Sequence, residues 1–277
     1  MIKKLLSICK IYGIAIKNTF DDEGTTKAAA LSFYAFFSLF PLILIFFSIL
    51  GFIVDSPDIS RKAALFLKDF FPASISSIER SIAYSINSKH KLGVIGFLIL
   101  LSSAVYFFTA LEEAINKAWK VKSERHFIRK KFLSFAIMFI AGIILLTSIS
   151  SMSFIYMLSG FTIIPDLVNG IFPMQDLIYE ILTSLTSFLL FLSFYKFLPN
   201  TQVTFREILP GTMITALMWE ILLNGFTFFI RSFTDYKVLY GPVTTLITIL
   251  SWIYVSCFII IIGAEFCSEY AREKRER

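Results

Sequence analysis

A single carboxylate interrupts an otherwise apolar stretch of the sequence, Ile208–Ile230. Glu220 lies near its centre, and the segments Ile208–Trp219 and Ile221–Ile230 on either side of it carry no charge. Together these segments supply about the ~20 residues that a helix needs to cross a bilayer. An ionised side chain at that depth costs several kcal/mol unless it is neutralised, paired or hydrated. Glu220 is therefore the first candidate for a functional residue.

The neighbours of Glu220 form a polar face on the predicted helix. At ~100° per residue, one arc of about 120° collects Thr212, Ala216, Glu220, Asn224, Thr227 and Arg231, and the opposite face collects Leu217, Met218, Leu222 and Phe229. Arg231 cannot pair with Glu220, because eleven residues of helix separate them by ~16 Å. A partner must come from another helix, and no other apolar stretch has a central Lys or Arg. We expect Glu220 to be protonated, hydrated or bound to a cationic group.

The whole chain has the composition of a membrane protein. Of its 277 residues 56% are hydrophobic and 17% are charged, and the mean hydropathy is +0.74, whereas soluble domains have about 45–50% apolar and about 25% charged residues. The apolar runs predict an all-α, polytopic protein with six transmembrane helices. The predicted spans are Ala28–Val54, Leu92–Leu111, Phe132–Pro165, Leu177–Leu198, Ile208–Ile230 and Val238–Ala264.

The distribution of basic residues orients these spans. In the six-span arrangement 18 of the 26 Lys and Arg residues fall on the side that holds both termini, and 8 fall on the other side. The positive-inside bias then places the N- and C-termini in the cytoplasm. The net charge of +6 is explained by this orientation and by contact with anionic lipid headgroups, and we expect no nucleic-acid partner.

The sequence divides into three predicted parts. Residues 1–27 form a cytoplasmic segment in which Ile2–Phe20 is an interfacial helix. Residues 28–267 form the transmembrane domain, with residues 55–91 as an extracytoplasmic segment of amphipathic outer helices between the first two spans. Residues 268–277 form a basic cytoplasmic tail.

Further polar and small residues stand at helix ends and faces. Glu112 and Glu113 are predicted to form a solvated, ion-paired helix end with Lys117 and Lys120.

Hydroxyl groups recur in the third and fourth spans, so an outward-opening polar cavity and packing of hydroxyls between helices are both possible arrangements. Gly263 and Cys267 share an arc that lets another helix approach closely. Secondary site candidates are Glu265, expected to stay hydrated at the end of the last span, Ser32 on a small-residue strip, and Tyr240 and Gly241 at the start of the last span.

Four stretches of the sequence resemble the YihY/BrkB family of bacterial inner-membrane proteins. They are "LSFYAFFSLFPLILIFFSILG", "AINKAWKV", "YGPVTTLITILSWIYVS" and "GAEF", and the resemblance runs from about Ala28 to Ala271. Pro242 stands where the family more often has a small residue. The resemblance implies six membrane helices in the bacterial cytoplasmic (inner) membrane. Family members have been labelled as ribonuclease BN-like, and this label can be tested on the residues.

The sequence does not support a nuclease. Zinc nucleases need clusters of His and Asp, but His90 and His126 are predicted on opposite sides of the membrane. We expect no enzyme activity, no metal and no cofactor. Two functions remain open. The first is a transporter or lipid-translocating protein that uses a polar cavity around Glu220 for an unidentified solute or lipid, with a possible homodimer supplying symmetry. The second is a non-transporting scaffold for envelope assembly or integrity, in which Glu220 is protonated and hydrogen-bonded to hydroxyls of the third or fourth span.

Overall fold

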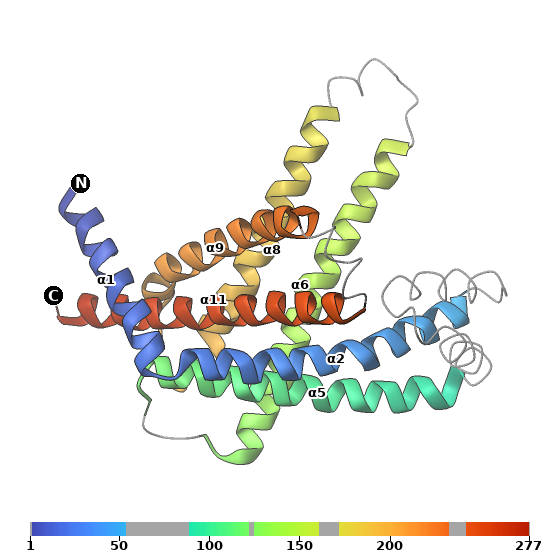
Figure 1. Cartoon of the computed structure of the whole chain (residues 1–277), viewed down its shortest axis with the longest axis horizontal. Helices are drawn as coiled ribbons and strands as arrows, with labels where there is room; N and C mark the ends of the chain where they lie inside the picture. Colours follow the sequence, from blue (N-terminus) through green and yellow to red (C-terminus); the bar gives the residue numbers. More distant parts are fainter. Residues whose placement is uncertain (1, 54–88, 122–124, 161–171, 233–241, 277) are drawn as a thin grey trace. The chain divides into compact units, whose positions relative to one another are not determined.

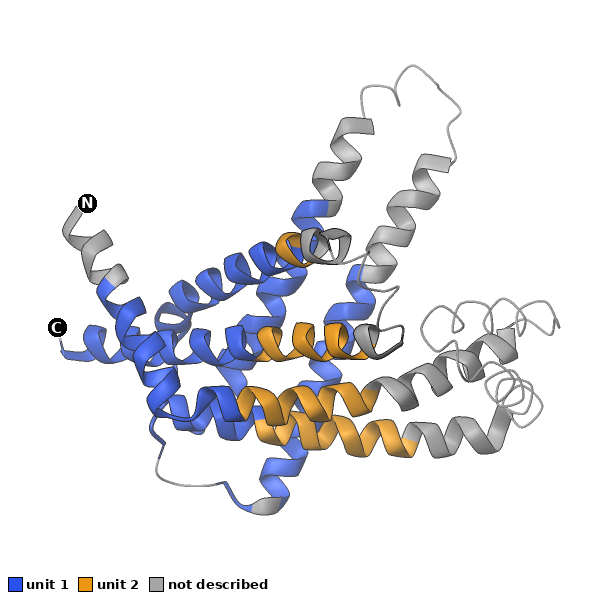
Figure 2. Cartoon of the chain, viewed as in Figure 1, with its two compact units in different colours: residues 1–26, 111–223, 258–277 blue, residues 27–110, 224–257 orange. Residues whose placement is uncertain are grey.

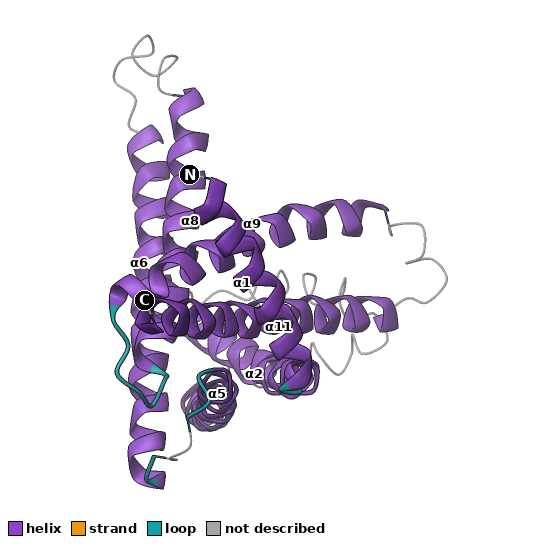
Figure 3. Ribbon diagram, turned by 90° about the vertical axis from the view of Figure 1, so that its left-hand side faces the viewer, coloured by secondary structure: helices purple, strands orange, loops and turns teal. Residues whose placement is uncertain are grey.

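The described part of the chain folds entirely into helices. The computed structural model describes residues 2–53, 89–121, 125–160, 172–232 and 242–276, and these ranges contain no strand (Figures 1 and 3). This confirms the all-α prediction for those residues. The helices are α1 (Ile2–Asp21), α2 (Gly24–Ile53), α5 (Lys89–Ala118), α6 (Phe127–Gly160), α8 (Phe172–Phe197), α9 (Phe205–Ser232) and α11 (Pro242–Glu276).

Five stretches in these helices are long and apolar enough to cross a membrane. They are Leu98–Ala118, Ile128–Ser148, Glu180–Phe197, Phe205–Phe226 and Leu246–Glu276, and each overlaps one of the predicted spans. The remaining predicted span, Ala28–Val54, falls mostly on α2, but side chains from residue 39 onward lie outside the described residues. The six-span count and the cytoplasmic termini therefore stay predictions. Most of the predicted outer segment, residues 55–91, also lies outside the described residues.

The chain divides into two compact units (Figure 2). Unit 1 contains residues 1–26, 111–223 and 258–277, so it includes both ends of the chain. Unit 2 contains residues 27–110 and 224–257. The division into residues 1–27, 28–267 and 268–277 follows the expected membrane boundary and stays a prediction. Helix α11 continues through residue 268 to Glu276 without a break.

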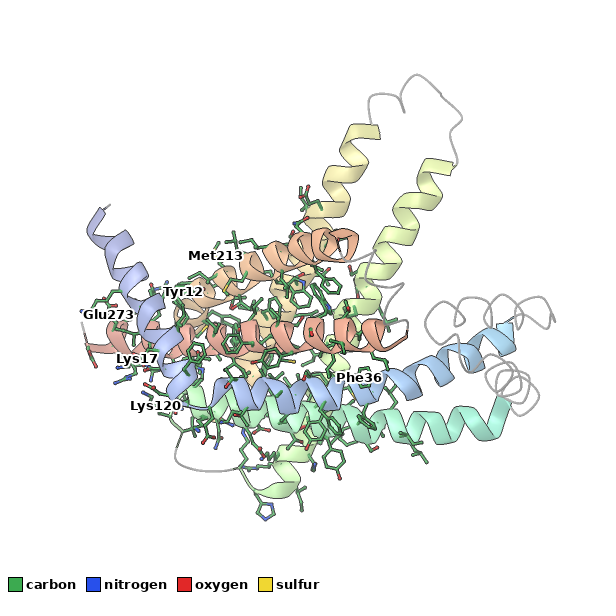
Figure 4. The ribbon with its side chains drawn as sticks, viewed as in Figure 1. Tyr12, Lys17, Phe36, Lys120, Met213 and Glu273 are labelled. Carbon is green, nitrogen blue, oxygen red and sulfur yellow. The ribbon has the colours of Figure 1, made fainter. Side chains whose placement is uncertain are left out.

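In unit 1, α6 and α8 lie side by side, and α1 packs on the end of α11. Ile11 and Ala15 of α1 are buried against Phe266 of α11. Tyr12, labelled in Figure 4, adds a ring contact with Phe266 at 6.3 Å between centroids and donates a hydrogen bond to the Met218 sulfur over 3.3 Å. This packing uses one face of α1, because residues three and four apart on a helix share a side.

Two features of local chemistry set helix ends in unit 1. The sequence "TFRE" begins α9 with a capping box: the Thr204 N–H donates to Glu207 Oε2 over 2.7 Å, which satisfies a backbone donor at the helix start. At the end of α5, Lys120 adopts a left-handed conformation with φ 52°. The Val121 N–H then donates to the Asn116 carbonyl over 3.0 Å, which is the pattern of a Schellman C-cap.

Aromatic contacts join the helix segments of unit 2. Tyr34 of α2 stacks on Tyr106 of α5, with 6.1 Å between ring centroids and 19° between ring planes. Phe226, near the end of α9, lies 4.2 Å from the Trp252 ring of α11. Pairs of this kind contribute about 0.5–1.5 kcal/mol beyond the area that they bury.

Candidate functional site

Glu220 is hydrogen-bonded to another helix of unit 1. The Ser184 hydroxyl of α8 donates to Glu220 Oε1 over 2.9 Å. The prediction that a partner must come from a different helix agrees with this geometry, and Ser184 belongs to the hydroxyl-rich fourth predicted span. Glu220 is half-buried. The Ser184 hydroxyl is a neutral donor, and the bond orients the carboxyl group.

Ser184 differs from its neighbours in where its hydroxyl points. Thr186 and Ser187 donate to the carbonyls of Leu182 and Thr183 in their own helix, over 2.8 and 3.0 Å. Such local bonds let a hydroxyl residue lie in an apolar helix at little cost. The Ser184 hydroxyl instead crosses to α9, which makes the Ser184–Glu220 pair a specific contact between helices.

Two further contacts hold α8 against α9 and fix the position of this pair. Phe191 meets Trp219 edge to face at 5.8 Å between ring centroids. Tyr195 follows one turn later, and its hydroxyl lies 3.0 Å from the Thr215 hydroxyl. Positions on α8 increase as positions on α9 decrease, so the two helix segments run antiparallel. The Ser184–Glu220 pair lies at one end of this row of contacts.

A tight junction of three helices closes the other end of the row. Tyr195 is fully buried, and its hydroxyl also donates to the Ile260 carbonyl of α11 over 2.9 Å. Gly263 makes this junction possible: a Cβ at that position would lie 1.9 Å from Thr215 Oγ1 and 2.2 Å from the Tyr195 hydroxyl. Near it, a Cβ on Gly211 would lie 2.2 Å from Cys267 Sγ. The close approach predicted at Gly263 and Cys267 is present, whereas the role of Tyr195 was not predicted.

Two of the other polar residues predicted on the Glu220 face, Thr212 and Asn224, have described side chains. Thr212 is fully buried, and its hydroxyl donates to the Ile208 carbonyl of its own helix over 3.0 Å. Asn224 is exposed and belongs to unit 2. The side chains of Thr227 and Arg231 lie outside the described residues.

The secondary candidates belong to different parts of the chain. Ser32, in unit 2, is buried and donates to the Ala29 carbonyl over 2.8 Å. Tyr240 and Gly241 lie outside the described residues. Glu265 belongs to unit 1 and is 1% exposed. The prediction that Glu265 stays hydrated is therefore wrong: Asp22, after α1, and Lys120, after α5, are among the groups that interact with it.

The apolar face of α9 is rotated from its predicted position. The exposed residues are Leu209, Met213, Leu217 and Ile221, which repeat every four positions; Figure 4 labels Met213. Leu217 was predicted on this face. Met218 was also predicted there, but it is half-buried because its sulfur accepts the hydrogen bond from Tyr12.

A second polar cluster surrounds Arg125 in the loop after α5. Its guanidinium donates to Glu112 over 2.9 Å, to the Asn200 side chain over 3.0 Å, and to the carbonyls of Leu198 and Pro199. The cluster ties the α5–α6 loop to the α8–α9 loop. Glu112 is 1% exposed, so the prediction that it is solvated is wrong. Its partner is Arg125, thirteen residues away, which spacing within one helix could not indicate.

Comparisons with known proteins place this arrangement in a family. A family model described as Virulence factor BrkB matches residues 15–277. A UPF0761 membrane protein of Pseudoalteromonas translucida is 27% identical over 265 residues, covering 94% of this chain and 86% of the relative. A UPF0761 membrane protein of Pseudoalteromonas atlantica is 26% identical and covers 88% of this chain and 80% of the relative. A UPF0761 membrane protein of Idiomarina loihiensis is 28% identical and covers 73% of this chain and 69% of the relative. No solved structure matches the chain.

Proposed function

The chain belongs to the Virulence factor BrkB family of membrane proteins, and on that premise we propose that it moves a lipid or a small polar solute past Glu220. The observation that carries the proposal is the Ser184–Glu220 hydrogen bond inside candidate membrane spans of α8 and α9. Acidic side chains in membrane spans are rare and mark the routes of ions, protons or substrates.

The chemistry of the pair suits a site that exchanges partners. A carboxylate accepts several hydrogen bonds, and Ser184 donates one of those that Glu220 accepts. A proton, an ammonium group or a hydroxyl of a passing molecule is a suitable exchange partner for such a carboxyl group. The buried Tyr195 junction then keeps the two helices together while the contents of the site change.

The same hydrogen bond also favours the second function, a non-transporting scaffold. A protonated carboxyl group held by a hydroxyl of the neighbouring helix is a stable element of a packed core, and hydrogen bonds between membrane helices contribute about 0.6–2 kcal/mol. The two functions differ in one property. Transport requires water or cargo to reach Glu220, whereas a scaffold needs a dry site.

Water access at position 220 separates the two functions. We would replace Cys9 and Cys257 with alanine and Cys267 with serine, introduce Glu220→Cys, and treat intact cells and inverted vesicles with a membrane-impermeant maleimide. Leu217→Cys is the matched control, because Leu217 is 63% exposed on the apolar face of the same helix. Labelling at 220 and not at 217 supports translocation. A folded protein that reacts at neither position from either side contradicts it.

Substitution of the carboxyl group tests whether Glu220 carries a proton. Glu220→Gln keeps an oxygen that accepts the Ser184 hydrogen bond but removes the titratable group. In liposomes that contain a pH-sensitive dye, we expect proton movement driven by a potassium diffusion potential in the unmodified protein and in Leu217→Ala, and its loss in Glu220→Gln. Equal proton movement in all three proteins would remove Glu220 from the proton route.

A further inference from the structure

Glu265 combines deep burial with a lack of hydrogen-bond partners. It lies on α11 in unit 1 and is 1% exposed. Neither of its carboxyl oxygens has a hydrogen-bond partner among the described residues. A buried polar group without a partner is rare in folded proteins and calls for a specific explanation, such as a bound ion or a catalytic role.

Glu269, one helical turn later on α11, differs from Glu265 because it has hydrogen-bond and ion-pair partners. Glu269 accepts a hydrogen bond from the Asn18 amide of α1 over 2.9 Å and pairs with Arg272 at 2.8 Å. Lys120, labelled in Figure 4, approaches Glu269 at 3.9 Å, and its side chain is half exposed. The nearby donors are therefore directed to Glu269, and Glu265 is left without a hydrogen-bonded counter-charge in this part of unit 1.

The groups that face Glu265 include a second carboxylate. Asp22 follows the last residue of α1, and its carboxyl group interacts with that of Glu265; Lys120 after α5 and Glu269 on α11 are the other charged groups acting on it. Two ionised carboxylates at one site repel each other, and a single shared proton removes the repulsion. Such a proton also supplies the hydrogen bond that Glu265 lacks.

A proton fits this site better than a metal ion does. Among the described residues, no group of three or more His, Cys, Asp or Glu side chains could hold a metal ion. A proton needs no further ligands, because the O–H of one carboxyl group donates directly to an oxygen of the other. It is taken up from water and released to water, and no other bond changes.

We propose that Asp22 and Glu265 form a proton-binding pair that couples the docking of α1 on α11 to pH. Glu265 precedes Phe266, which packs on Ile11 and Ala15 of α1, and Asp22 directly follows α1. The docked form binds the shared proton, so docking strengthens as pH falls. When pH rises and the proton leaves, two like charges face each other and α1 is released. This inference does not depend on the function proposed for Glu220.

Cysteine labelling of α1 tests the coupling in the full-length protein. In the cysteine-replaced background we would compare Ile11→Cys, a 4% exposed position in the interface, with Lys10→Cys, its exposed neighbour. The ratio of the two maleimide rates cancels the effect of pH on thiol reactivity. We expect this ratio to rise between about pH 6 and pH 9, by at most about tenfold per pH unit for a single linked proton. In Glu265→Gln and in Asp22→Asn it should stay low and constant, whereas Glu269→Gln should keep the dependence on pH.

Infrared spectroscopy detects the protonated carboxyl group directly. Infrared difference spectra of the reconstituted protein across the same pH range should contain the carbonyl band of a protonated carboxylic acid that disappears as pH rises, and Glu265→Gln should lack it. A labelling ratio that does not change with pH in the unmodified protein would overturn the proposal. So would a band that persists when Glu265→Gln is combined with Glu220→Gln, which removes the other carboxyl group proposed to carry a proton.

Discussion

Replacement of Gly263 by alanine is a severe test of the described packing. The added Cβ would meet Thr215 Oγ1 at 1.9 Å and the Tyr195 hydroxyl at 2.2 Å. Both distances are far inside van der Waals contact, and neither hydroxyl is at the end of a long flexible chain. The three helices of the junction must therefore separate, or the hydroxyls must leave their hydrogen bonds.

The expected cost follows from these two effects. Overpacking of a core costs about 1–3 kcal/mol. Loss of the Tyr195 bonds to Thr215 and to the Ile260 carbonyl adds about 0.5–1.5 kcal/mol for each bond. We expect Gly263→Ala to lower the free energy of unfolding by about 2–6 kcal/mol. Unfolding in mixed detergent micelles, followed by circular dichroism and repeated as a thermal melt, measures the change.

Matched controls come from glycines without such neighbours. A Cβ at Gly142 of α6 or at Gly225 of α9 would meet no atom within 4 Å. Alanine at these positions should be neutral or should stabilise the helix by about 0.5–1 kcal/mol, because glycine loses more backbone freedom on folding. If Gly263→Ala is as harmless as Gly142→Ala, the close contact of α8, α9 and α11 does not exist as described.

Three other substitutions test further contacts by the same unfolding measurement. Arg125→Ala should cost about 3–5 kcal/mol by leaving Glu112 buried without its counter-charge, and adding Glu112→Gln should recover part of that loss; additive costs would contradict the pairing. Glu207→Gln keeps an oxygen for the Thr204 cap but loses the ion pair with Arg275, whose side chain is 52% exposed, so it should cost less than about 1 kcal/mol; a larger loss would mean that the ion pair is the main contact. Ser184→Ala should cost about 1–2 kcal/mol through the lost bond to Glu220, and an unchanged stability would argue against that bond.

The features that depend on one segment at a time were predictable from the sequence. Long apolar runs predict helices because a bilayer core of about 30 Å demands about 20 apolar residues whatever the neighbours are. Five described helices contain stretches that are long and apolar enough to be predicted spans. Glu220 was identified by the same argument, because its cost depends on depth in the membrane and not on its partners.

The residues that contact Glu220 and Arg125 could not be predicted, because they depend on how far one helix is shifted along another. The sequence contains many hydroxyls in the third and fourth predicted spans, and nothing local distinguishes Ser184 from Thr186 or Ser187. Only the position of α8 along α9, set by the Phe191–Trp219 and Tyr195–Thr215 contacts, brings one of them to Glu220. The same limit explains Arg125. In the sequence it is one of several basic residues before α6, whereas in the structure it reaches Glu112 across the loop.

Burial of charge was the least predictable property, because it depends on helices that arrive from distant parts of the chain. Glu112 and Glu265 both stand near the ends of apolar runs, where a single helix would leave them in water. Glu112 is covered by Arg125, which in turn bonds Asn200 of the α8–α9 loop. Glu265 is covered by α1 and the turn that follows it. The group next to Glu112 is the guanidinium of an arginine, whereas a group next to Glu265 is another carboxylate. That difference separates a structural ion pair from the pair for which we propose a shared proton.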